Sequence, residues 1–331
     1  MINKDIIRYI KKSEIDKLQK FIKINYSKSS ILSKNKNLIN FYYNYHKKSN
    51  INFLGYFKKN KLVGVAGIIK LENWDKKLLK NFFLGLLVKD KKLYQEITFS
   101  FFNYIYSRLK PKLFVCSGFN NNVKKIYKKI GQIEKFSHYY IFNENIKSGL
   151  SKNLQKTTFS KFKNDKLRIK ECKRLEKLPK SDYYPIKSKK YFTQKYSNNP
   201  FYKYSFLEFK KNNKLLFFFV IRKIKVKKNI SIVRIVDFYG KLSNKNYLGR
   251  TLKQYLQVNN YEYIDFLCIG LENKLLKKVG FNLKKNKQLI PNYFEPYIKK
   301  NIKLELCTFI NNYKNCVFFK ADGDQDRPNI I

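Results

Sequence analysis

The chain has 331 residues and a formal net charge of +49, from 72 Lys and Arg against 23 Asp and Glu. Hydrophobic residues make up 44 % and aromatic residues 17 %, which excludes general disorder, and the length suits two domains of ordinary size. The longest apolar run, residues 215–221, is too short to span a membrane, and the N-terminal segment lacks the apolar stretch of a secretory signal, so we expect a cytoplasmic protein.

Lysine supplies most of the positive charge, with 64 Lys against eight Arg. Together with the many Asn, Ile, Tyr and Phe, this is typical of an A/T-rich genome, so the charge is partly mutational bias. It predicts non-specific polyanion binding at low salt more than a dedicated nucleic-acid partner. The five Cys stand in no CxxC or Cys/His spacing and there are only two His, so we expect reduced, buried thiols and no metal site.

Two distant segments of the chain resemble each other. "FLGYFKKNKLVGVAGII" (53–69) and "FLEFKKNNKLLFFFVIR" (206–222) each predict a β-hairpin with a Lys/Asn turn. Further matching elements follow in the same order: buried strands at 81–88 and 233–240, strands at 113–118 and 265–270, and short amphipathic helices with a terminal Gly at 120–132 and 271–282. We therefore predict a duplication, with an N-terminal domain over 1–145, a polar linker over 146–165 and a C-terminal domain over 166–331.

Each copy is predicted to run helix, hairpin, strand, helix, strand, helix, strand. This order resembles the acyl-CoA N-acyltransferase fold of the Gcn5-related superfamily, which implies an α/β (α+β) chain with two tandem domains, each a mixed, mostly antiparallel sheet flanked by helices. Asn120, Val123, Tyr127 and Gly131 match the motif of that family's last helix. The resemblance implies that Tyr127 protonates the departing thiolate, and Gly131 is expected to end the helix in a left-handed cap. The alternative for Tyr127 is an ordinary aromatic on a helix face.

The resemblance also implies acetyl-CoA or another acyl-CoA as co-substrate, with its pyrophosphate at a Gly-rich loop that opens a helix. The first copy has no Gly there (88–99), whereas the second (237–252) offers candidate cofactor-binding residues at Gly240, Ser243, Gly249 and Arg250. Lys245 and Lys253 are further phosphate candidates, or part of a solvated helix face. The second copy has Leu276 in place of the motif Tyr, so neither copy carries a full set and the working copy stays open.

Three later segments (189–209, 289–301 and 318–329) carry a narrower resemblance. They look like two-lobed acyltransferase-like proteins of bacterial surface-polysaccharide and modified-sugar biosynthesis. This implies a small-molecule amine acceptor linked to a sugar, with Asn292, Tyr293 and Glu295 as candidate substrate-binding residues.

The tail "KADGDQDRPN" places Asp322, Asp324 and Asp326 at alternate positions in a chain otherwise poor in acids. One interpretation is a calcium loop, but its sixth position holds Arg327 where Gly is needed. Another is a solvated terminus. A third is an ordered active-site segment in which a carboxylate binds the acceptor ammonium and takes its proton.

For the third interpretation we predict Asp322, Asp324, Asp326 and Asp237 as catalytic candidates beside Tyr127. Arg327 and Asn329 are predicted to bind substrate. The function expected is an acyl-CoA-dependent N-acyltransferase. The alternatives are a two-lobed transferase that uses aminoacyl-tRNA, an inactive scaffold of the same fold, and a basic nucleic-acid-binding module. Acceptor, acyl chain, working copy and oligomeric state stay open.

Overall fold

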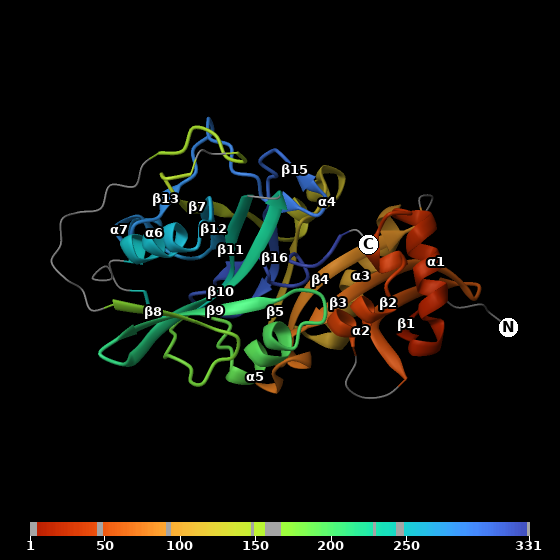
Figure 1. The fold of residues 1–331 in the computed structure, drawn as a ribbon. Coiled ribbons are helices and arrows are strands. Elements are labelled where there is room, and N and C mark those ends of the chain that lie inside the picture. Colours follow the sequence, from red (N-terminus) through yellow and green to blue (C-terminus); the bar gives the residue numbers. More distant parts are fainter. Residues whose placement is uncertain are drawn as a thin grey trace. The chain divides into compact units, whose positions relative to one another are not determined.

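A computed structural model of the chain describes residues 5–44, 49–90, 94–146, 149–155, 167–227, 230–242 and 248–329 (Figure 1). Its contacts divide the chain into two compact units. Unit 1 comprises Met1–Ile133, Glu305–Tyr313 and Gly323–Ile331, and unit 2 comprises Glu134–Leu304 and Lys314–Asp322. The last 27 residues therefore pass from one unit to the other twice.

Unit 1 is built on a seven-stranded sheet with the order β1-β2-β3-β4-β5-β16-β6. The strands are β1 (Ile6–Lys11), β2 (Asn50–Lys58), β3 (Lys61–Lys70), β4 (Asn81–Lys89), β5 (Leu113–Ser117), β16 (Glu305–Asn311) and β6 (Gln132–Lys135). The last two residues of β6, Glu134 and Lys135, already belong to unit 2. The helices are α1 (Ile15–Asn25), α2 (Lys36–Tyr43), α3 (Tyr94–Tyr104) and α4 (Asn121–Ile130). β1 to β4 are antiparallel, β4 and β5 are parallel, and β16 is antiparallel to β5.

The two faces of this sheet carry different helices, because successive side chains of a strand point to opposite sides. Leu54, Leu84 and Phe114 face a core that α3 and α4 close. On the other face the ring of Tyr43, at the end of α2, packs on Phe53 with 4.4 Å between centroids.

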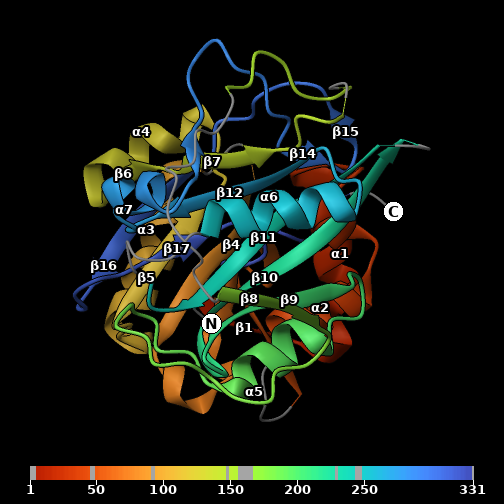
Figure 2. The same ribbon diagram turned by 60° about the vertical axis from the view of Figure 1, so that its left-hand side comes forward.

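Unit 2 has a sheet of the order β13-β7-β12-β11-β10-β9-β8, with β17 paired to β12. Its strands are β13 (Asn282–Leu283), β7 (Ser137–Phe142), β12 (Tyr263–Ile269), β11 (Ile230–Gly240), β10 (Lys214–Lys227), β9 (Tyr204–Lys211), β8 (Leu167–Cys172) and β17 (Phe318–Phe319), and β14 (Tyr293–Phe294) pairs with β15 (Tyr297–Ile298) apart from this sheet. α6 (Leu248–Val258) covers one face through Leu248, Leu252 and Leu256 (Figure 2). α7 (Asn273–Lys278) contributes Leu276 to the same core, and α5 (Lys189–Phe192) lays Phe192 on Phe218 of β10.

The predicted hairpins, strands and short helices are confirmed, and the turn residues explain the hairpins. Lys59 and Asn60 in the first turn and Asn212 and Asn213 in the second have positive φ, which suits the tight turn between twisted antiparallel strands. β1 was not predicted, because its alternation is hidden by Lys and Arg at the N-terminus.

The prediction of a left-handed cap at Gly131 is wrong. Gly131 has φ −164° and ψ 174°, which is extended backbone. The reason for glycine is space: a Cβ there would lie 2.7 Å from the carbonyl oxygen of Thr308 and 2.8 Å from Sγ of Cys307, both on β16. The chain continues directly from α4 into β6. In the second copy, Gly280 does have positive φ just beyond α7.

The domain boundaries were predicted from the sequence repeat, and they stay a prediction. Much of the predicted linker lies outside the described residues. Two strands do not follow chain order in their pairing: β7 pairs with β12 in unit 2, and β16 pairs with β5 in unit 1.

Candidate active site

In unit 1, β4 carries one residue more than its partner β3. Gly67 pairs with Leu86 and Ile68 pairs with Leu84, so Gly85 is left over as a β-bulge. The last pair between the parallel strands β4 and β5 is Leu84 with Cys116. Gly85 therefore lies where these two strands stop pairing, a point that we call the fork of unit 1.

The C-terminal tail brings a carboxylate to this fork. Asp324 is 2 % exposed, and its Oδ2 accepts hydrogen bonds from the Tyr43 hydroxyl at 2.9 Å and from Nε of Arg327 at 2.7 Å. A Cβ on Gly85 would lie 2.4 Å from the Tyr43 hydroxyl and 3.3 Å from that Oδ2. Only glycine leaves room for both groups beside the strand.

Electrostatics keep this group of side chains in defined protonation states. Burial, with the Asp324 carboxylate adding to it, raises the pKa of Tyr43 well above its ordinary value, so Tyr43 stays a hydrogen-bond donor. Burial alone would lower the pKa of Arg327, but the charge of Asp324 outweighs it and raises that pKa. Gln325 fixes the same tail segment by donating from Nε2 to the Ser117 carbonyl at the end of β5, at 3.1 Å.

Tyr127 lies on the opposite face of the sheet, beside the last strand pair before the fork. It is 2 % exposed on α4 and shares the core of α3 and α4 with Leu84 and Cys116, and its side chain hydrogen-bonds the Cys116 thiol. Burial raises the pKa of that thiol, so it remains protonated. Phe119 and Phe309 pack edge-on against the Tyr127 ring and hold its orientation. The predicted residue thus lies in the aromatic core and also contacts the last strand pair before the fork.

Gly85→Ala is expected to displace Tyr43 and to destabilise unit 1 by about 1–3 kcal/mol, the usual cost of inserting a methyl group into a packed site. Denaturant unfolding would measure it. Gly149→Ala is a fair comparison, because there the one atom closer than 3 Å to the added Cβ would be Cδ1 at the end of the Ile230 side chain. Equal stability of Gly85→Ala and wild type would contradict the crowded geometry.

A related tyrosine–aspartate pair occurs in unit 2. β11 has its own bulge, since Val220 pairs with Asp237 and Ile221 with Ile235, leaving Val236 over. The Tyr196 hydroxyl donates to Oδ2 of Asp237 at 2.6 Å. Tyr43 and Tyr196 each stand ten residues before the hairpin phenylalanines Phe53 and Phe206, so they occupy equivalent positions of the predicted repeat.

The pair in unit 2 differs because a lysine is buried with it. Nζ of Lys187 lies 2.7 and 2.8 Å from the two carboxylate oxygens of Asp237 and 3.6 Å from Oδ1 of Asp322, and all three side chains are at most 2 % exposed. Burial disfavours the ammonium, but the two carboxylates outweigh it and raise the pKa of Lys187. Burial raises the pKa of Asp322, although Lys187 opposes it.

In unit 2 the backbone of the tail pairs with the strands of the corresponding fork. The last pair of β11 with β12 is Ile235 with Phe266, and beyond it β17 pairs with Cys268 and Ile269 of β12. β7 occupies the other edge of β12, and the Ala321 N–H donates to the Val236 carbonyl at 3.0 Å. Nζ of Lys195 donates to the Ala321 carbonyl at 2.7 Å. The backbone groups of the diverging strands are therefore taken up by the protein's own tail.

Burial of Asp322, Asp324 and Asp326 excludes the solvated-tail interpretation. Asp322 and Asp324 have separate basic partners, Lys187 and Arg327, which does not favour a calcium loop. Asn329 is half-buried just after Pro328.

The other predicted substrate-binding residues lie elsewhere in unit 2. Glu295 accepts hydrogen bonds from Tyr202 and, at 3.1 Å, from Arg222. The amide of Asn292 pairs with both backbone groups of Ile302, at 2.7 and 2.8 Å, and Tyr293 is half-buried in β14.

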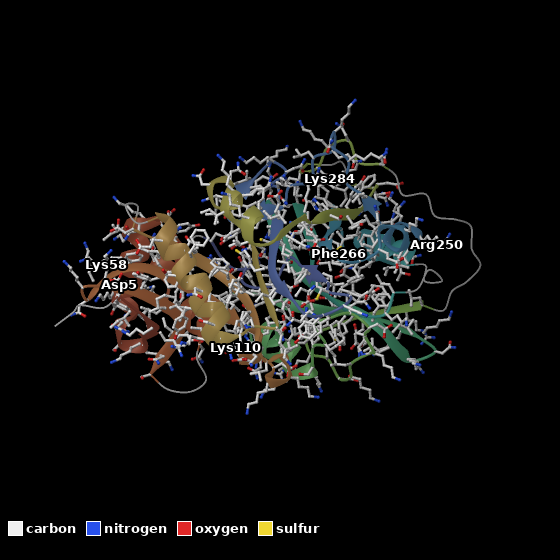
Figure 3. All side chains as sticks on the ribbon, turned by 180° about the vertical axis from the view of Figure 1, so that it is seen from behind. Asp5, Lys58, Lys110, Arg250, Phe266 and Lys284 are labelled. Carbon is white, nitrogen blue, oxygen red and sulfur yellow. The ribbon has the colours of Figure 1, made fainter. Side chains whose placement is uncertain are left out.

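The predicted cofactor-binding residues of the second copy are spread over several roles. Gly240 has φ +124°, and a Cβ there would lie 2.5 Å from Cα of Phe217. A glycine is therefore needed at this position for β10 to pack so closely. The Gly249 N–H donates to the Val279 carbonyl at 2.7 Å, which leaves that donor occupied. Arg250 is exposed on α6 (Figure 3), and Ser243 and Lys245 lie outside the described residues.

Comparison with solved structures gives the fold. Over 92 % of this chain and 72 % of the other, a GCN5-related N-acetyltransferase from Anabaena variabilis ATCC 29413 superposes with a TM-score of 0.52 at 10 % identity. The chain has the fold of the GCN5-related N-acetyltransferases. The predicted fold class, mixed sheets flanked by helices in two sheet-based domains, is thus confirmed. That each unit is a tandem copy of this fold stays a prediction.

Two further structures are similar at lower scores. A conserved protein of Enterococcus faecalis V583, described as a probable N-acyltransferase, has 10 % identity and a TM-score of 0.48 over 91 % of this chain and 72 % of that one. A GCN5-related N-acetyltransferase from Sphaerobacter thermophilus has 6 % identity and a TM-score of 0.42 over 93 % and 97 %. No protein-family model matches the sequence, and a comparison with curated proteins finds no match. Among the described residues, no helix has the length and apolarity needed to cross a membrane.

Several residues that build the two forks were not predicted from the sequence, namely Tyr43, Gly85, Lys187 and Tyr196. The available signal was positional: a Tyr recurs at the same distance before each hairpin. In a chain with 26 Tyr, that signal has little weight without the structure.

Proposed function

We propose that the protein transfers an acyl group from acyl-CoA to an amine on a sugar or sugar nucleotide, and that the chemistry takes place at the fork of unit 1. The observation that carries the proposal is that two different groups lie on opposite faces of one sheet near the fork: a carboxylate beside Gly85, and a tyrosine that contacts Cys116 in the last strand pair before it. Asp324 comes with Tyr43 on the α2 face, and Tyr127 lies on the face of α3 and α4.

Acyl transfer to an amine needs one group that takes a proton from the acceptor nitrogen and another that protonates the departing thiolate. In the proposal, Asp324 binds the acceptor ammonium and takes its proton as the amine nitrogen attacks the thioester carbonyl carbon. The carbon–sulfur bond then breaks, and Tyr127 donates its hydroxyl proton to the departing thiolate. The nitrogen loses a second proton to solvent as it becomes an amide, and Tyr127 regains a proton from solvent. Arg327 and Tyr43 hold the Asp324 carboxylate in place through two hydrogen bonds to the same oxygen.

The fork suits an elongated donor such as acyl-CoA because diverging parallel strands leave backbone donors and acceptors along their edges. Strand β4 also carries a glycine bulge there, and Gly85 leaves the room in which Tyr43 and Asp324 lie beside the strand. Donor binding is assigned to unit 1 because β17 and Ala321 occupy the equivalent place in unit 2. For Asp237 and Asp322 we accordingly propose a structural role. The sugar-linked acceptor and the place in polysaccharide biosynthesis rest on the sequence resemblance.

Calorimetric titration with acetyl-CoA tests the proposal at about 150 mM salt, where surface attraction is screened within ~8 Å. We expect saturable binding at one site per chain, competition by desulfo-CoA, and loss of binding in Gly85→Val, which would fill the fork. Two sites, or full binding by Gly85→Val, would contradict the assignment to unit 1. Equal weak binding of CoA, ATP and pyrophosphate would overturn acyl-CoA as donor and favour the aminoacyl-tRNA or scaffold alternatives.

A further inference from the structure

Unit 2 contains a buried polar chain that the proposed acyl transfer does not use. Arg234 on β11 donates to both carboxylate oxygens of Asp265 on β12, from Nε at 3.1 Å and from a terminal nitrogen at 2.7 Å. Asp265 in turn lies 3.2 Å from Nε2 of His138 on β7. Arg234 is 1 %, Asp265 0 % and His138 9 % exposed. Three adjacent strands thus align a guanidinium, a carboxylate and an imidazole.

The partners determine which imidazole nitrogen carries the proton. Although burial opposes it, Arg234 and His138 lower the pKa of Asp265 to about 2, so Asp265 is an ionised acceptor. Nε2 of His138 must therefore donate to it. Burial is the largest effect on His138 and lowers its pKa, with Arg234 and Lys284 adding to it and Asp265 opposing it. The neutral imidazole then presents Nδ1 as a hydrogen-bond acceptor.

His138 lines a cavity of about 440 Å³ whose charged groups all have one sign. Lys135, Lys284 and Lys303 contribute ammonium groups, Asn286 and Asn301 contribute amides, and no acidic side chain is among the described residues of the lining. Burial, and after it the charge of Lys135, lowers the pKa of Lys284, which means that these two lysines repel each other. Lys284 lies at the rim of unit 2 (Figure 3).

We propose that this cavity binds the phosphate group of a small phosphate monoester. The lysines would contact the phosphate oxygens, and Nδ1 of His138 would accept a hydrogen bond from a hydroxyl of the ligand or of its phosphate. The volume lies in the range of small-molecule sites, and the repulsion between Lys135 and Lys284 favours a ligand group that carries more than one negative charge. The inference is independent of the proposed acyl transfer.

Lysines on this chain also attract polyanions without specificity, so binding alone is not enough evidence. What distinguishes the site is the buried imidazole below the lysines. A ligand there must perturb His138, whereas diffuse attraction to the surface does not. The chain has only one other histidine, His46, which serves as an internal reference.

The experiment is a histidine-selective NMR titration of the full chain with glucose 6-phosphate, at about 150 mM salt to screen surface charge. We expect saturable shifts of the His138 ring signals and none for His46, with no response to glucose. The bound dianion favours the imidazolium, so the pKa of His138 should rise on binding. Lys284, Lys135, Lys303, Arg234 and Asp265 are the charged groups around it, and Asp265 is already ionised.

Lys284→Gln should weaken binding at least about tenfold, the cost of one charge-assisted hydrogen bond. The matched control is Lys23→Gln, which removes the same charge from the exposed face of α1. His138→Asn should remove the selectivity for glucose 6-phosphate over inorganic sulfate, while circular dichroism reports folding. Absence of saturable His138 shifts, or equal weakening by Lys284→Gln and Lys23→Gln, would overturn the site.

Discussion

Asp324→Asn should lower kcat by about 10²–10⁴-fold, the contribution typical of a general base, and leave the protein folded. The amide keeps the size of the carboxylate and can still accept the hydrogen bond from Tyr43 through its oxygen, but it neither attracts an ammonium nor takes its proton. A coupled assay of thiol release from acetyl-CoA with an amino-sugar acceptor measures the effect. KM for the acyl donor should change little, because Asp324 lies on the face of α2.

Two comparisons make this result specific. Asp16→Asn is the matched control, since it makes the same chemical change at an exposed position of unit 1, where the Asp16 side chain is 77 % exposed. It should keep full activity. Asp322→Asn tests the rival location in unit 2: loss of turnover there, with Asp324→Asn active, would transfer the chemistry to unit 2 and contradict the proposal.

Local sequence patterns predicted most of the fold because they report local forces. The Lys/Asn turns with positive φ and the apolar runs beside them specify the hairpins β2–β3 and β9–β10, whatever the rest of the chain does. Local sequence patterns could not predict the pairing of β16 with β5. A strand of that composition fits either sheet, and the choice depends on contacts between residues far apart in sequence.

The C-terminal tail also makes contacts at the candidate site that local sequence patterns could not predict. Asp324 was predicted as catalytic from its acidity in a basic chain, and the structure brings it to Gly85. Its partner Tyr43 is separated from it by 281 positions, and no spacing rule connects them. Asp322 stands two positions earlier, yet it belongs to unit 2 and contacts Lys187, because Gly323 with its positive φ turns the chain between them. Alternation of the three acids indicated one shared site, whereas the backbone separates the first two.

Lys187→Met should lower the free energy of unfolding by about 3–5 kcal/mol, the cost of removing one partner from a buried ion pair. Methionine fills much of the lysine volume, so the loss reports charge and not a cavity. Asp237 and Asp322 would remain buried near each other without the ammonium between them, and the charge of Lys195, the Tyr196 hydroxyl and two backbone N–H groups would compensate only in part.

The pH dependence gives this prediction a second test. Burial raises the pKa of Asp322, and without Lys187 less opposes this, so the folded pKa of Asp322 lies above the unfolded value of about 4. Its protonated form therefore stabilises the fold at low pH, and that stabilisation disappears as pH rises through the folded pKa. The deficit of the variant should therefore be small near pH 4 and full at pH 7. Lys241→Met, which removes a surface ion pair whose lysine is 72 % exposed, should leave stability unchanged at either pH. Denaturant unfolding of both variants and wild type at the two pH values measures these differences.

A Lys187→Met protein as stable as wild type but without turnover would mean that Lys187, Asp237 and Asp322 are catalytic. A structural ion pair this deeply buried cannot lose its cation without a loss of stability.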